Sequence, residues 1–274
     1  MKTDLTNKTI VLTGGSSGIG AAAARILTKM NARVVITGRS DATKKLAEEL
    51  KCDYFLVDYA KYSSVKAFAA ELLQKYPKID VLVNNVGGII STRRLTGDGH
   101  EQTLQVNHLS GFLLTQLLKE RLEESKALVI NTSSIANMFG KVDFTDLQNA
   151  NAYQAMKAYG SAKLMNILHA MEINKRFKGV RAVSFHPGTV ETGFAREGSG
   201  FLKWAYETSV KRLFLISPEK GADTLVWFIT STPDKDWKAG EYYYKRKPGR
   251  KNAQVKPDIA AQLWDESEKL VASK

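Results

Sequence analysis

Cysteine is almost absent: Cys52 is the single cysteine among 274 residues, which excludes an intramolecular disulfide. No combination of Cys and His has the spacing of a metal site, so no bound metal is expected. Nowhere do eighteen apolar residues follow one another, and residues 1–8 are polar, so neither a spanning helix nor a signal peptide is predicted. These absences indicate a reducing, cytoplasmic setting, with the chain at most peripheral to a membrane.

Linkers and repeats are also missing. No internal repeat, low-complexity segment or long stretch of Pro, Gly and Ser divides the chain. The content of hydrophobic residues, 43%, and of charged residues, 25%, is typical of a globular protein and speaks against disorder or a fibrous repeat. We therefore expect residues 1–274 to form one catalytic domain.

Acidic residues are scarce relative to basic ones, because 28 Asp and Glu stand against 40 Lys and Arg, a formal net charge of +12. The excess is densest in residues 235–256, the basic C-terminal segment, where Asp236 and Glu241 accompany eight cations: Lys235, Lys238, Lys245, Arg246, Lys247, Arg250, Lys251 and Lys256. Two interpretations stay open: an ordinary solvated surface, or weak electrostatic association with a membrane or another polyanion. Nucleic acid is not expected as a partner.

Short apolar runs rich in β-branched residues alternate with amphipathic stretches. The runs are typical of strands buried on both faces, and they cover residues 9–13, 33–37, 54–57, 81–83, 128–132 and 181–185. The stretches carry apolar residues at three-and-four spacing, which predicts helices over 21–30, 65–76, 103–122 and 155–177. The alternation predicts an α/β fold, a Rossmann-type doubly wound parallel sheet with helices on both faces.

A glycine-rich turn follows the first predicted strand and leads into the first helix. Its spacing is Gly-x-x-x-Gly-x-Gly, which differs from the usual dinucleotide fingerprint Gly-x-Gly-x-x-Gly. Glycines let backbone N–H groups approach a pyrophosphate closely, although such a turn can also be merely structural. The candidate phosphate-binding residues are Gly14, Ser16, Ser17, Gly18, Ile19 and Gly20.

Three further motifs occur in order along the chain: Asn-Asn-Val-Gly at 84–87, Ser133-Ser134, and Tyr159 with Lys163, followed by Pro187-Gly188. With the glycine turn, they make the chain similar to the short-chain dehydrogenase/reductase superfamily. Residues 107–115, 142–152 and 263–267 resemble its retinol-dehydrogenase-like branch. One departure is Val86, where the family usually has alanine.

The resemblance implies further contacts with a nicotinamide dinucleotide. It places Asp58 at the adenine and Asn85, Val86 and Gly87 near the adenosine ribose. After the sixth predicted strand it adds Pro187, Gly188, Val190 and Thr192.

The end of the second predicted strand indicates which dinucleotide is bound. Selectivity for NAD requires an acidic residue there, whereas a basic residue accommodates the 2′-phosphate of NADP. This strand runs into Arg39 and Ser40, a guanidinium and a hydroxyl, so NADP(H) is the expected cofactor. The alternative is that Arg39 stacks on adenine or points to solvent.

Tyr159 and Lys163 are four residues apart in a predicted helix, so both side chains project from one face. A free tyrosine has a pKa of about 10, and bringing this pKa near 7 requires roughly 4 kcal/mol of differential stabilisation. A nearby ammonium supplies part of it. We expect Tyr159 to be the general acid/base and both residues to contact the cofactor.

Ser134 follows the fifth predicted strand, at the edge where open parallel sheets bind ligands, and its hydroxyl would hold the reacting oxygen. The family resemblance selects it over Ser133 and implies that Asn107 positions a water beside the lysine in a proton relay. Taken singly, each residue also has a structural interpretation, such as a turn cap. For His108 and His186 we favour that structural interpretation over a role as bases.

The expected substrate is a small apolar aldehyde or ketone, or the corresponding alcohol. Residues 194–216 mix aromatics, glycines and charges, which is compatible with a lid over the substrate or with an ordinary surface helix. A homodimer or homotetramer fits the resemblance. The competing hypothesis is a dinucleotide-binding regulator or scaffold without useful catalysis.

Overall fold

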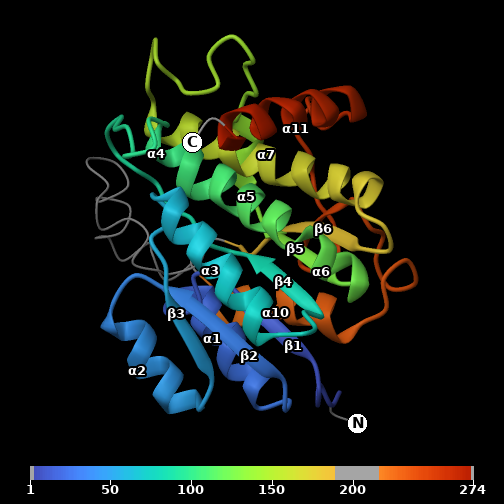
Figure 1. The fold of residues 1–274 in the computed structure, drawn as a ribbon. Helices are drawn as coiled ribbons and strands as arrows, with labels where there is room; N and C mark the ends of the chain where they lie inside the picture. Colours follow the sequence, from blue (N-terminus) through green and yellow to red (C-terminus); the bar gives the residue numbers. More distant parts are fainter. Residues whose placement is uncertain (1–2, 189–215, 273–274) are drawn as a thin grey trace.

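A computed structural model describes residues 3–188 and 216–272 (Figure 1). In these ranges eight strands form one sheet in the order β3-β2-β1-β4-β5-β6-β7-β8, parallel except for the β7–β8 pair. The strands are β1 (Thr9–Leu12), β2 (Arg33–Gly38), β3 (Asp53–Leu56), β4 (Val81–Asn84), β5 (Leu128–Thr132), β6 (Arg181–His186), β7 (Tyr242–Tyr244) and β8 (Lys247–Pro248). The predicted α/β fold is confirmed.

Strand β3 corrects one expectation. The prediction of strands buried on both faces holds for the central strands β1, β4 and β5, whose residues are almost all buried. In β3 the burial alternates, and Tyr54 and Leu56 are exposed. The reason is position, because β3 is an edge strand and one of its faces is incompletely covered.

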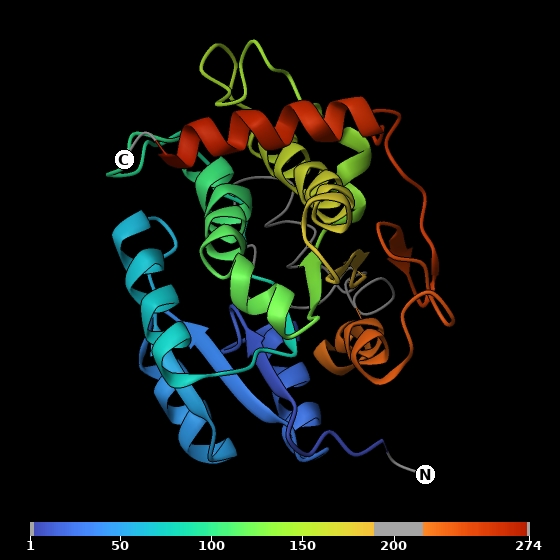
Figure 2. The same ribbon diagram turned by 45° about the vertical axis from the view of Figure 1, so that its right-hand side comes forward.

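Helices cover both faces of the sheet (Figures 1 and 2). One apolar core packs α3, α5, α7 and α11 on one face, and a second packs α1, α2 and α10 on the other. Helix α11 lies across α7. The bounds are α1 (Gly18–Thr28), α2 (Asp41–Leu50), α3 (Tyr62–Lys75), α5 (Ser110–Leu117), α7 (Ala155–Arg176), α10 (Pro218–Thr230) and α11 (Pro257–Ala272).

The helix predicted over 103–122 is not continuous. It consists of α4 (Gln102–Leu104), a π-helical turn η1 (Gln105–Leu109), α5, and α6 (Lys119–Glu124) after a break at Leu118. Apolar periodicity does not reveal a π-turn, because one extra residue shifts the register only locally. π-Turns are frequent at functional sites, and this one contains Asn107.

No helix in the described ranges combines the length and apolar character needed to cross a bilayer.

Candidate active site

The predicted site segments meet at one edge of the sheet, because each follows the carboxyl end of a parallel strand. The glycine turn follows β1, Arg39 follows β2, and Asp58 lies two residues beyond β3. Asn85 to Gly87 follow β4, Ser133-Ser134 follow β5, and Pro187-Gly188 follow β6. The fold therefore brings together segments far apart in the sequence.

The glycine turn is shaped for close approach of backbone. Gly14 has a positive φ of 65°, and a Cβ at Gly20 would clash with the Gly14 carbonyl oxygen. Ser17 is the exposed N-cap of α1, its side chain makes no capping hydrogen bond, and no acidic residue occupies the first turn. Open N–H groups at this helix end are suited to an anion, so the turn fits a dinucleotide pyrophosphate.

Neighbouring strands fix the turn. The Thr37 hydroxyl accepts a hydrogen bond from Gly14 N at 3.2 Å. The Asn85 side chain donates to Thr13 O at 3.1 Å and accepts from the Thr132 hydroxyl at 3.1 Å, which ties β1 to β5. Asn85 thus shapes the turn with its side chain, a role that the sequence motif did not show. Val86 packs against Gly14.

Arg39 and Ser40 lie exposed directly after β2, and no acidic residue precedes them at the strand end. Asp58 is half-buried, and one of its carboxylate oxygens accepts a hydrogen bond from Ala60 N at 3.0 Å. The exposed Arg39 guanidinium is therefore available to a phosphate at the end of β2, and the backbone N–H groups of the glycine turn are available to the pyrophosphate. They fit NADP(H).

Gly87 lies between Asn107 and Lys163. A Cβ at this position would clash with Asn107 Oδ1 and would lie 2.8 Å from Lys163 Nζ. The Asn107 amide is held by Gly88, whose N donates to Oδ1 at 2.9 Å and whose O accepts from Nδ2 at 3.0 Å. The π-turn, the loop after β4 and helix α7 therefore converge, which explains the need for glycine at 87.

Lys163 is buried beneath Tyr159. Its Nζ donates to Thr132 O at 3.2 Å and lies 5.5 Å from the centroid of the Tyr159 ring. Burial lowers the pKa of Lys163 from 10.5 to about 7. The ammonium form of Lys163 is therefore dominant below neutral pH and declines above it.

The two serines after β5 have different surroundings. Ser133 is buried, and its hydroxyl donates to Lys163 O at 2.7 Å. Ser134 is half-buried and caps the 3₁₀ helix η2 (Ile135–Phe139) by accepting from Ala136 N at 3.2 Å. Because the Ser133 hydroxyl is committed to backbone, Ser134 is the serine whose hydroxyl has room for a ligand.

The loop after β6 reaches the limit of the described chain. Gly188 has a positive φ of 100°, and a Cβ there would clash with the side chain of Ile216. Val190 and Thr192, predicted to contact the cofactor, lie outside the described residues. The same holds for the predicted lid, of which Ile216 alone is described.

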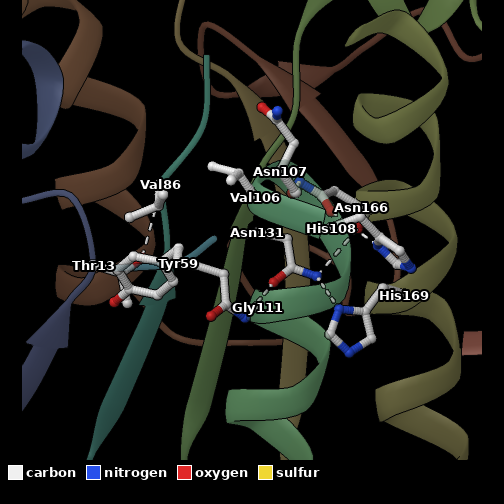
Figure 3. A pocket seen from close by; sticks show the side chains of 11 residues that line it. Thr13, Tyr59, Val86, Val106, Asn107, His108, Gly111, Asn131, Asn166 and His169 are labelled. Carbon is white, nitrogen blue, oxygen red and sulfur yellow. Dashed lines mark hydrogen bonds between the residues drawn. The ribbon is translucent and has the colours of Figure 1, made fainter. Parts of the chain in front are cut away.

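Behind Asn107 lies a polar network that sequence reasoning missed, around the small cavity of Figure 3. Asn166 Nδ2 donates to Asn107 O at 3.0 Å and to Thr132 O at 3.1 Å. Asn166 Oδ1 lies 3.2 Å from His108 Nδ1, and His108 Nε2 lies 3.0 Å from the Ser267 hydroxyl of α11. The available signal was spacing, because Asn166 stands three residues after Lys163 on the same helix.

Neither candidate histidine is placed as a base. Because the Asn166 oxygen accepts, His108 carries its proton on Nδ1, and burial lowers the pKa of His108 to about 4. Burial likewise lowers the pKa of His186 to about 4, and its ring stacks on Tyr244 with centroids 4.8 Å apart. Both rings are neutral at pH 7, in keeping with the structural interpretation.

Comparison with known proteins identifies the family. The sequence model of the short chain dehydrogenase family matches residues 8–200. DnrU of Streptomyces sp. (strain C5), provisionally described as a daunorubicin C-13 ketoreductase, is 39% identical over 272 residues, 96% of this chain and 92% of the relative. Human retinol dehydrogenase 11 is 34% identical over 275 residues, 96% of this chain and 85% of that protein.

Solved structures show the same fold. The crystal structure of an uncharacterized protein from Mycobacterium Paratuberculosis has a TM-score of 0.79 at 27% identity, covering 98% of this chain and 95% of that one. The RhlG/NADP complex of Pseudomonas aeruginosa has a TM-score of 0.67 at 23% identity, covering 88% and 95%. The chain therefore belongs to the short-chain dehydrogenase/reductase family of oxidoreductases, which act on alcohols or carbonyls with NAD(P)(H).

Proposed function

We propose that the chain transfers hydride between NADP(H) and an apolar aldehyde or ketone, or the corresponding alcohol, with Tyr159 as general acid/base. One observation carries the proposal: Gly87 leaves room for both Asn107 and Lys163, and Lys163 Nζ lies beneath the Tyr159 ring. Three segments thus meet around one tyrosine. We also propose that residues 1–274 act as one catalytic unit in a reducing, cytoplasmic setting.

The side chains divide the proton chemistry among them. Tyr159 gives a proton to the substrate oxygen in reduction and takes one from the alcohol in oxidation. Ser134 donates a hydrogen bond to the same oxygen and holds it within reach of the phenol. The Lys163 ammonium stabilises the phenolate, and Asn107 maintains the proton route beside it. When bound, the nicotinamide would supply or accept the hydride.

The preference for NADP(H) rests on Arg39. Its guanidinium is exposed at the end of β2, where it can pair with a 2′-phosphate through two parallel hydrogen bonds, and Ser40 offers a further donor. The backbone of Gly14 to Gly20 and the N-terminus of α1 would hold the pyrophosphate. Asp58 and Val86 follow β3 and β4 at the same edge and would contact the adenosine.

An apolar substrate is supported by the surface beside Ser134. Ile135 and Phe139 on η2 are 46% and 72% exposed, so they offer apolar surface directly after Ser134. The relatives' names denote action on retinol and on a ketone of daunorubicin. The aromatics of the segment proposed as a lid lie outside the described residues: Phe194, Phe201, Trp204 and Phe214.

The test is a screen that follows NADPH and NADH oxidation in parallel with decanal, acetophenone, all-trans-retinal and daunorubicin. Tyr159→Phe should lower kcat by roughly 10²–10⁴-fold, while NADPH affinity stays largely unchanged. Tyr54→Phe, on the exposed edge strand β3, is the matched control. Full turnover by Tyr159→Phe would refute the assignment. A wild-type protein that binds NADPH without oxidising it with any carbonyl would favour the regulator hypothesis.

A further inference from the structure

The basic C-terminal segment contains a half-exposed stretch that runs along the loop after Ser134. Residues 249–255, here called the C-terminal strap, follow β8 and precede α11. The Asn252 side chain donates to Asn137 O at 2.8 Å and to Gly140 O at 2.9 Å. The Asn252 backbone N donates to Asn137 Oδ1 at 3.2 Å. One residue of the strap thus binds three acceptors in the loop after Ser134.

A second strap residue closes the far end of the same loop. Gln254 Nε2 donates to Val142 O at 3.0 Å, and Gln254 Oε1 accepts from Val142 N at 2.9 Å. This pair of bonds imitates the pairing of two neighbouring strands. Asn252 and Gln254 therefore hold residues 137–142 at both ends, across more than a hundred residues of sequence.

The contact continues to the catalytic serine. Asn137 is fully buried, and its Nδ2 donates to Ser134 O at 2.8 Å and to the Tyr242 hydroxyl at 3.3 Å. Asn137 is the middle residue of η2, the 3₁₀ helix that begins directly after Ser134. With five residues, η2 is too short to hold its geometry by its own hydrogen bonds. The position of Ser134 consequently depends on Asn137, and that of Asn137 on Asn252.

The other side of the loop rests on helix α7 beside Tyr159. A Cβ at Gly160 would clash with Ala136 O and would lie 3.1 Å from Gly140 N. Such close packing means that a displacement of the loop changes its distance from Tyr159. The loop after Ser134 is thus held between the C-terminal strap on one side and α7 on the other.

We propose that Asn252 and Gln254 are positioning residues, which set the distance between the Ser134 hydroxyl and the Tyr159 phenol. The inference rests on the proposed function, because those two groups bind the reacting oxygen. It gives the basic C-terminal segment a structural task in catalysis. Its cations are partly engaged within the fold, since Lys251 pairs with Glu241 at 2.6 Å and Arg246 pairs with Asp223.

The chain offers a matched control in Asn174, near the end of α7. Asn174 Nδ2 donates to Ala170 O at 2.7 Å and to Ala182 O at 2.9 Å, and its Oδ1 accepts from Ala182 N at 3.0 Å. The Asn252 side chain has the same pattern: its Nδ2 donates to two backbone carbonyl oxygens, and its Oδ1 accepts from Gln254 N at 2.9 Å. Both side chains are half-buried. Asn174→Ala and Asn252→Ala should therefore lose similar stability.

Activity should separate the two variants. Asn252→Ala should lower kcat by roughly 10–100-fold, since a misplacement of about 1 Å can cost 10²-fold, and NADPH affinity should be unchanged. Asn174→Ala should retain kcat. Hydrogen exchange followed by mass spectrometry should show faster exchange of residues 137–142 in Asn252→Ala alone. The probe is the carbonyl compound with the highest kcat/KM in the screen above.

A double-mutant cycle with Ser134→Ala tests the route of the effect, with residual turnover measured at high enzyme concentration. If Asn252 acts through Ser134, Asn252→Ala should add little to the loss caused by Ser134→Ala. Independent, multiplicative losses would overturn the inference, as would wild-type kcat in Asn252→Ala or unchanged exchange of residues 137–142. Undiminished turnover by Ser134→Ala would instead refute the assigned role of Ser134 itself, a failure of the proposed function.

Discussion

Replacing Lys163 by methionine should stabilise the ligand-free protein at low pH while abolishing turnover. The Lys163 side chain is buried, with only 2% of its surface exposed, and burial lowers its pKa from 10.5 to about 7. This fall corresponds to roughly 5 kcal/mol of unfavourable charging free energy, at about 1.4 kcal/mol per tenfold change. Methionine has a similar shape and no charge.

The sign of the pH dependence follows from proton counting. Between pH 7 and 10.5 the unfolded chain binds more protons at this lysine than the folded protein does, so stability rises with pH across that window. Below about pH 7 the cost of the buried charge is complete. Methionine also loses the hydrogen bond to Thr132 and the contact with the Tyr159 ring, together about 2–3 kcal/mol. The net gain near pH 6 is therefore about 2–3 kcal/mol.

Urea unfolding of the ligand-free protein at several pH values from 6 to 10 measures this difference. The advantage of Lys163→Met should shrink as the pH rises and should vanish or reverse near pH 10. Lys157→Met, at an exposed position of the same helix α7, should change stability little at any pH. A destabilised Lys163→Met variant whose deficit is the same at every pH would refute the reasoning.

Two further variants test the cofactor edge. Gly20→Ala places a Cβ against the Gly14 carbonyl and should cost about 1–3 kcal/mol of unfolding free energy and weaken NADPH binding. Gly97→Ala, whose Cβ would meet nothing within 4 Å, is its control, and equal NADPH affinity in both variants would contradict a tight cradle. Arg39→Asp should lower kcat/KM with NADPH by roughly 10–100-fold, the value of charge-assisted hydrogen bonds, and favour NADH. Arg33→Asp, at the opposite end of β2, should leave the cofactor preference unchanged, and an unchanged preference in Arg39→Asp would exclude a phosphate contact.

The repeating parts of the fold could be predicted from the sequence because their signal is local. Buried parallel strands appear as apolar, β-branched runs, and the six predicted strands agree with β1 to β6 to within one residue or so at each end. Strands β7 and β8 escaped prediction because they are short and lie in a charged stretch. The partial exposure of β3 depends on its place at the sheet edge, which a single run of residues does not contain.

For the site, the order and spacing of the motifs determined by themselves which residue types lie at the carboxyl edge of the sheet. The four-residue spacing of Tyr159 and Lys163 already placed both on one helix face. Only the tertiary structure decided what surrounds them. Three features depend on contacts between segments far apart in the chain. They are the burial that lowers the pKa of Lys163, the position of Asn107 in a π-turn, and the hydrogen bonds from Asn252 to the loop after Ser134. Spacing fixes neighbours along one element, whereas burial and long-range hydrogen bonds depend on how the elements pack, and no local pattern encodes that packing.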